Sequence, residues 1–320
     1  MPAAAVRALA PDDIAAMHEL AVAGHTRLRG ALPFLPAGAA TGLEAKLARL
    51  IDEGIAYGAM DGGRLRTFLG ALLIPGLRGG KTGSLSLEWA HGSAVPAAAP
   101  ADARHLYREL ARELVVRDCR LHTVGVFATD GGVESAFAQL GFGRFLANRA
   151  SPLQRVVASL GEAPVPERYT LVRATAEHAP GLARLHGRLE THLEASPVFL
   201  PEAEPWPVER WAQWLDGAEG IVFVILRGGA AVGYIKAQEP QFDVSYAVHG
   251  NETLAINGMF VEREHRGTGI AQALLSAIAH EGRRRALRVL SVDHETANIE
   301  ADGFWSRYFA PVSWALERRV

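Results

Sequence analysis

Residues 258–271 read Gly-Met-Phe-Val-Glu-Arg-Glu-His-Arg-Gly-Thr-Gly-Ile-Ala. An apolar, β-forming segment runs into a short loop, and the loop runs into an amphipathic helix predicted over 269–285. Gly267 and Gly269 allow a tight turn and a close approach of the backbone to a ligand. The free N–H groups at the start of a helix favour a phosphate or pyrophosphate, and Arg266 adds a positive charge. The pattern predicts a phosphate-binding loop, with a glycine-rich helix cap that holds no ligand as the alternative.

Two common nucleotide motifs do not fit this loop. A P-loop needs a Lys-Ser/Thr pair, and the dinucleotide fingerprint needs Gly-x-Gly-x-x-Gly spacing. The loop instead resembles the acyl-CoA signature of the GNAT superfamily of N-acetyltransferases, Gln/Arg-x-x-Gly-x-Gly/Ala, with Arg266, Gly269 and Ala271 in its fixed places. Downstream, residues 298–305 (Asn-Ile-Glu-Ala-Asp-Gly-Phe-Trp) resemble the superfamily segment Asn-x-x-Ala-x-x-Phe-Tyr. The resemblance covers all of the second half of the chain and, through an internal repeat, the first half as well.

The resemblance implies a site for acetyl-CoA as acyl donor, with no metal. The strand before the loop pairs its backbone with the pantetheine amides, the loop and helix start supply an N–H cradle, and Asn298 binds the pantetheine arm or positions the next helix. A bulge at Gly258 would splay two strands and leave backbone groups free for the cofactor. The implied cofactor-binding residues are Met259, Phe260, Val261, Arg266, Gly267, Thr268, Gly269, Ile270, Ala271, Gln272 and Asn298.

The catalytic residues follow from the same resemblance. A superfamily tyrosine often protonates the leaving sulfur, but its position here is Trp305, whose indole is not a general acid. Tyr308, about one turn further on, is the predicted substitute, with packing against Phe304 as the alternative. Asp293 stands where related enzymes place a catalytic carboxylate. An Asp of ordinary pKa, about 3.9, is a weak base unless burial raises that pKa, so Asp293 could equally order a water or bind the substrate ammonium.

Three tryptophans lie close together between the first helix and the second strand of this half, at Trp206, Trp211 and Trp214. Aromatic walls suit amines and flat apolar groups. The cluster therefore predicts either a wall of the acceptor site or a tryptophan-rich helix that packs into the core.

The chain repeats itself at an offset of 166 residues. Val-Arg-Ala at 6–8 recurs at 172–174, and Gly-Gly at 62–63 recurs at 228–229. A shared offset over such distances indicates a duplicated domain, joined near the proline-containing segment 161–166.

Two tandem GNAT-like domains are therefore predicted, over residues 1–163 and 164–320. Each is expected to be α/β (α+β), with a mixed, mostly antiparallel sheet flanked by helices. The first half lacks the signature, and Pro96 and Pro100 remove N–H donors from its cradle region. We expect this half to be non-catalytic and to mimic the second protomer of a GNAT dimer.

Composition limits the remaining functional classes. A formal net charge of −2 over 320 residues gives no basic field for nucleic acid or an anionic membrane. No apolar run reaches the ~18 residues of a membrane span, and the N-terminus does not resemble a signal peptide. A single cysteine fits a reducing setting. The sequence predicts a cytoplasmic protein, either a monomer with an internal pseudo-dimer or a weak homodimer.

The combined expectation is an N-acetyltransferase that moves an acetyl group from acetyl-CoA to a small-molecule amine by direct attack in a ternary complex. Two alternatives stay open. Trp305 favours an acyl-CoA-binding pseudoenzyme that senses or scaffolds, and an open acceptor groove would favour a protein or peptide N-acetyltransferase.

Overall fold

The computed structural model describes residues 5–37, 41–79, 82–161, 163–201, 204–217, 220–240 and 246–320. These residues pack into two compact units, and each unit is described by itself. The first unit comprises Met1–Asn148, Gln241–Gly250 and Pro311–Val320, and the second comprises Arg149–Pro240 and Asn251–Ala310. No helix in the described ranges combines the length and the apolar character that crossing a membrane requires.

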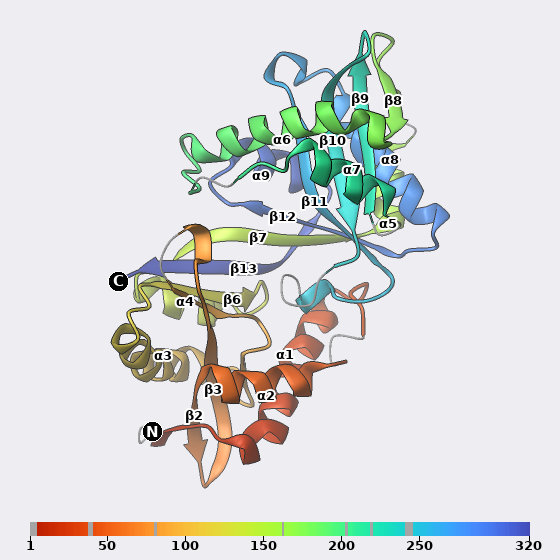
Figure 1. Ribbon diagram of the computed structural model, residues 1–320. Coiled ribbons are helices and arrows are strands. Elements are labelled where there is room, and N and C mark those ends of the chain that lie inside the picture. Colours follow the sequence, from red (N-terminus) through yellow and green to blue (C-terminus); the bar gives the residue numbers. More distant parts are fainter. Residues whose placement is uncertain are drawn as a thin grey trace. The chain divides into compact units, whose positions relative to one another are not determined.

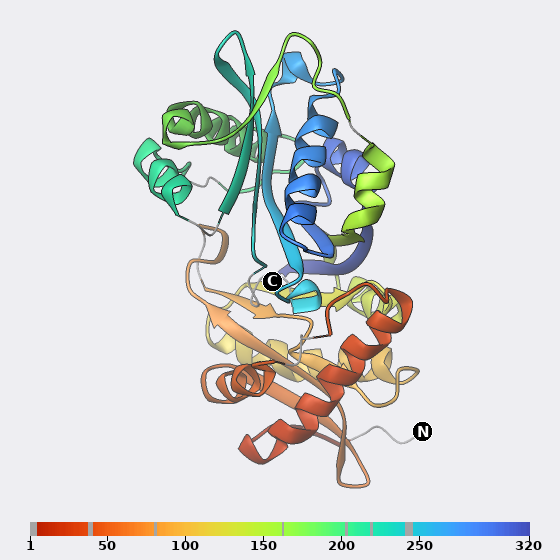
Figure 2. The ribbon, with the colours of Figure 1, turned by 90° about the vertical axis from the view of Figure 1, so that its right-hand side faces the viewer.

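The second unit is built on a mixed sheet with the strand order β12-β11-β10-β9-β8. Only β11 and β12 run parallel, and the other neighbours are antiparallel. Figure 2 shows α6 and α7 on one face of this sheet and α8 on the other. The elements of this unit are α5 (Leu153–Leu160), β8 (Thr170–Arg173), α6 (Ala179–Glu194), α7 (Val208–Asp216), β9 (Gly220–Arg227), β10 (Ala230–Gln238), β11 (Thr253–Val261), α8 (Ile270–Arg284), β12 (Val289–Glu295) and α9 (Ile299–Trp305).

The first unit repeats this order (Figure 1). Its sheet runs β1-β2-β3-β4-β6, with β4 and β6 parallel, and β5 pairs with β3. The alternating pattern of residues 85–89 predicts one strand, but only Leu85 and Ser86 belong to a strand, β4, because a turn follows them. β5 begins only at His91. The elements of this unit are β1 (Ala5–Ala8), α1 (Ile14–Ala31), α2 (Leu43–Glu53), β2 (Ile55–Asp61), β3 (Arg64–Ile74), β4 (Gly83–Ser86), β5 (His91–Ser93), α3 (Ala99–Val116), β6 (Leu121–Phe127) and α4 (Gly131–Gln139).

The boundaries of the units differ from the predicted domains at both ends of the second half. The last strand of the chain, β13 (Ala310–Arg319), pairs antiparallel with β6 and so completes the sheet of the first unit. The strand β7 (Gly143–Pro152) begins in the first unit and ends in the second. Residues 149–163, which we assigned to the first domain, thus pack with the second unit.

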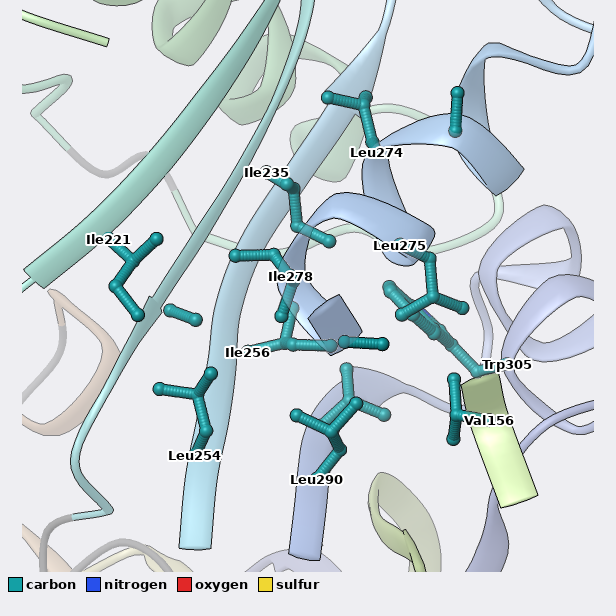
Figure 3. Packing of buried hydrophobic residues seen from close by; sticks show 14 of the residues in the cluster. Val156, Ile221, Ile235, Leu254, Ile256, Leu274, Leu275, Ile278, Leu290 and Trp305 are labelled. Atoms are coloured by element: carbon teal, nitrogen blue, oxygen red, sulfur yellow. The ribbon is translucent and has the colours of Figure 1, made fainter. Parts of the chain in front are cut away.

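One face of the second sheet is covered by a core that α8 completes. Alternate residues of the apolar run 221–226 enter two different cores, which explains why this strand is apolar throughout. Leu274, Leu275 and Ile278 of α8 are fully buried against the strands (Figure 3). The predicted amphipathic helix is therefore confirmed, together with the side that it buries.

Truncation of this core should be costly. We expect Leu274→Ala to lower the free energy of unfolding by about 2–5 kcal/mol, because Leu274 is fully buried and its removal leaves a cavity. The matched control is Ile299→Ala at a side chain that is 73% exposed, for which we expect a change within about 0.5 kcal/mol. Urea denaturation of both variants measures the difference, and similar losses in the two would contradict this description of the core.

Candidate active site

The two parallel strands of the second unit separate into a fork. β11 and β12 pair over four residues each, ending at Ile256 and Val292, and both strands continue beyond that pair. The register between β10 and β11 shifts at the same level, where Lys236 lies opposite Gly258 and the next pair involves Ile256. Asn257 is the extra residue, so the bulge predicted at Gly258 is confirmed next to it. The fork leaves backbone edges of both strands unpaired with each other, as a site for an extended ligand requires.

The glycine loop forms an open cradle at the start of α8. Gly267 and Gly269 have φ values of 75° and 94°, a region that side chains with a Cβ avoid. A Cβ built on Gly267 would meet no atom within 4 Å, so the space above the loop is open. The N–H of Ala273 donates to the carbonyl of Gly269 at 3.0 Å and so begins the helical hydrogen bonds. The N–H groups before it face the cradle without intrahelical partners, which fits the pyrophosphate of a coenzyme A ester.

The cradle opens into a cavity of about 560 Å³ within the second unit. This volume lies in the range of small-molecule sites. Thr268 does not line the cavity, because its hydroxyl donates to the carbonyl of His265 at 2.7 Å. The other ten residues predicted for acetyl-CoA line it together: Met259, Phe260, Val261, Arg266, Gly267, Gly269, Ile270, Ala271, Gln272 and Asn298.

The lining residues that were not predicted from the sequence include Leu189, His192 and Arg307. Leu189 and His192 come from α6, which lies far from the loop in sequence, so no local pattern could indicate them. Arg307 follows α9 and is exposed at the cavity, without an ion pair in the part of the chain that the structure describes. It offers a positive charge to a phosphate.

Arg266, the cation predicted for that task, already has protein partners. Its Nε donates to the carbonyl of Val261 at 3.0 Å, and its guanidinium forms an ion pair with Glu300 of α9. The predicted residue thus joins the loop to α9.

The segment after β12 forms one wall of the cavity. The Asn298 side chain accepts a hydrogen bond from the Ala301 N–H at 3.1 Å and caps α9. The structure therefore shows the helix-positioning role of Asn298, while its contact with pantetheine stays a prediction. Trp305 is buried and lines the cavity. Tyr308 does not line it: its ring packs against Phe304, with 5.4 Å between centroids. Tyr308 therefore packs as the alternative to a general-acid role predicted. The reason is that α9 ends before Tyr308, and the chain then directs its ring to the core.

Asp293 lies at the fork, directly after the last paired residue Val292. Because Val292 enters the core on the α8 side, Asp293 points to the face that carries α6 and α7. It is open to solvent there, yet desolvation by surrounding protein and repulsion by Glu295 raise its pKa to about 6. His294 points the opposite way, is buried, and accepts a hydrogen bond from Nε of Arg149 at 3.0 Å. The fork therefore presents the carboxylate of Asp293 to the α6–α7 face.

The tryptophan cluster is mainly core. Trp211 is fully buried, and Trp206 and Trp214 pack against it with centroid distances of 5.2 and 6.3 Å. Trp206 additionally lies beside the ammonium group of Lys236, 4.1 Å from the ring centroid.

The equivalent place in the first unit is closed to a phosphate. The cavity at the start of α3 measures only about 160 Å³, and Pro96 and Pro100 line it. Asp102 in the first turn of α3 is buried and binds Arg66 through both carboxylate oxygens, at 3.0 and 2.6 Å. A fixed carboxylate thus stands near the helix start where a cradle would hold an anion.

The fork, the cradle and the cavity define a GNAT-type acyltransferase site. Residues 188–309 match the model of the Acetyltransferase (GNAT) family, so this part of the chain is a GNAT domain. No curated protein matches the chain.

Solved structures show that the whole chain has a tandem GNAT fold. A tandem GNAT protein from the clavulanic acid biosynthesis pathway is 17% identical with a TM-score of 0.53, and the match covers 98% of each chain. A GCN5-related N-acetyltransferase from Sphaerobacter thermophilus is 16% identical with a TM-score of 0.61, over 98% of this chain and 95% of that one.

Proposed function

We propose that the second half of the chain transfers an acetyl group from acetyl-CoA to the amine of a small-molecule acceptor, by direct attack in a ternary complex. The observation that carries the proposal is the position of Asp293, a carboxylate of raised pKa at the fork where the cavity strands β11 and β12 part. A base near neutral pKa beside a thioester site is what amine acylation needs.

Different residues of the cavity would bind different parts of the donor. The helix-start N–H groups of α8 would bind the pyrophosphate, and the unpaired edge of β11 would bind the pantetheine amides. Phe304 and Trp305 give the cavity an apolar wall. Arg307 would meet a phosphate that lies outside the cradle.

The transfer forms one C–N bond and breaks one C–S bond. The acceptor enters as an ammonium, and Asp293 or a water bound to it takes the proton, so that the neutral amine attacks the thioester carbonyl. As the adduct collapses, the nitrogen loses its second proton to solvent and the coenzyme thiolate leaves. The thiolate then takes up a proton from solvent. A thiol of ordinary pKa, about 8.5, is a fair leaving group, so the step does not require a tyrosine at the position of Trp305.

A direct test combines binding with turnover on the full chain. We expect acetyl-CoA at 100 times its dissociation constant to stabilise the chain by about 2.7 kcal/mol, seen as a raised unfolding midpoint. We expect free thiol to appear when small amines are added. Binding without thiol release from any small amine or peptide would establish the pseudoenzyme, and release only with peptides would establish a protein acetyltransferase. Absence of binding would overturn the proposal.

The chain should bind one acetyl-CoA, not two. Pro96, Pro100 and the buried Asp102–Arg66 pair in the first unit oppose a second cradle. Titration calorimetry is expected to give a stoichiometry near one. A value near two would show that the first unit binds the donor after all.

A further inference from the structure

A buried lysine lies beside the fork. The side chain of Lys236 on β10 is 8% exposed, and within the described ranges it makes no hydrogen bond or ion pair. Its Nζ is instead framed by indole rings, at 4.1 Å from the centroid of Trp206, 5.7 Å from Trp211 and 5.5 Å from Trp214. Burying an ammonium group without a hydrogen-bond acceptor is costly, so its donors are expected to meet an acceptor in the working state.

Lys236 and Asp293 share one face of the sheet at the fork. Lys236 lies opposite Gly258, two residues beyond the last β11–β12 pair, and Asp293 directly follows that pair. A Cβ on Gly258 would come within 3.6 Å of Cε of Lys236, so the glycine leaves the lysine stem open toward the fork. Ile235 and Val292, their neighbours in sequence, both enter the core on the α8 side. Lys236 and Asp293 therefore both point to the α6–α7 face.

The two charges attract each other without pairing. Asp293 favours the charged form of Lys236, yet no Lys236–Asp293 ion pair forms within 4.0 Å. The guanidinium carbon of Arg210 lies 4.2 Å from the centroid of the Trp206 ring and adds a second positive charge. Glu190 adds a negative charge, and its carboxylate lies 3.1 Å from Nε2 of His186. An ammonium and a carboxylate that stand apart at one site match a ligand with the opposite arrangement of charges.

We propose, on the basis of the function proposed above, that Lys236 binds a carboxylate of the acceptor while Asp293 receives its ammonium. The acceptor class is then a small zwitterion, an amino acid or a close relative. Transfer takes place at its amine, and the carboxylate stays unchanged. A single buried ammonium matches one negative charge, which favours a carboxylate over a phosphate dianion.

The test compares amino acids with their decarboxylated amines as acceptors, for example glycine with methylamine and phenylalanine with phenethylamine. We expect the full chain to prefer the amino acid in kcat/KM by at least about tenfold, the scale of one charged hydrogen bond. Lys236→Met keeps the length of the side chain and removes its charge, and it should reduce that ratio to near one. Lys236→Arg should restore part of the preference. Phosphoethanolamine as a third acceptor distinguishes a phosphate from a carboxylate.

A binding measurement keeps the two proposals separable. Amino acids should raise the unfolding midpoint of the chain saturated with coenzyme A, and Lys236→Met should lose this shift while still being stabilised by acetyl-CoA. If no acceptor is turned over, but amino acids raise the midpoint of the native chain and not that of Lys236→Met, the proposed transfer activity is wrong and the proposed carboxylate site is supported. A native chain that prefers decarboxylated amines, or a ratio and a shift that Lys236→Met leaves unchanged, overturns the assignment of Lys236.

Discussion

Replacing Gly269 by aspartate is expected to abolish acetyl-CoA binding, with a loss of affinity of at least about 100-fold. Gly269 has a φ of 94°, so a Cβ strains the loop, and the new carboxylate would stand at a helix start that is proposed to hold a pyrophosphate. The unfolding midpoint of the native chain should rise with acetyl-CoA, by the equivalent of about 2.7 kcal/mol at 100 times the dissociation constant. The midpoint of Gly269→Asp should not move.

The matched control is Gly228→Asp in the turn between β9 and β10. Gly228 also has a positive φ, 56°, and faces open space, so the substitution brings the same backbone strain and the same charge in the same unit. We expect both variants to lose intrinsic stability by about 1–2 kcal/mol, but only Gly269→Asp to lose the ligand shift. An equal loss of binding in Gly228→Asp would show that destabilisation, not the cradle, accounts for the result.

The cradle could be predicted from the sequence because it is local. Its glycines, its strand and its helix follow one another within 14 residues, so spacing alone places them together. The bulge beside Gly258 is local in the same sense. The ion pair of Arg266 with Glu300 is not a local feature, because it depends on how α9 packs. The position of Arg307 at the cavity depends on the packing of α9 in the same way.

The pairing of β13 with β6 shows a second limit of prediction from sequence. The apolar pattern of residues 312–316 predicts a strand, and β13 is there, but the pattern says nothing about which strand it pairs with. The element order alone favoured pairing within the second half. The structure pairs β13 with β6, because the register from Ser313 to Arg319 fits an edge that the first half leaves free.

Lys236 is the clearest case of a site residue without a sequence signal. A lone lysine in an apolar strand looks like an edge residue, and only the meeting of β10, α7 and the fork surrounds it with tryptophan. Asp293 was found because a family resemblance pointed to it, whereas its raised pKa comes from neighbours that the sequence does not bring together.

The strongest kinetic effect is expected at Asp293. Asp293→Asn keeps the shape of the side chain and removes the base, so we expect kcat to fall by about 10²–10⁴-fold. Acetyl-CoA affinity should stay within about twofold, because Asp293 does not line the donor cavity. If Asp293 only binds the acceptor ammonium, the loss would appear in KM for the acceptor and not in kcat.

The pH profile separates these roles further. The active form of Asp293 is the carboxylate, and its pKa is raised to about 6, so kcat of the native chain should be full above that pH and fall as pH drops through it. Asp293→Asn should lack this acid limb. Glu295→Gln removes one cause of the raised pKa, and it should move the limb to lower pH while keeping kcat at neutral pH. An unchanged limb in Asp293→Asn would assign the titration to another group and remove Asp293 as the base.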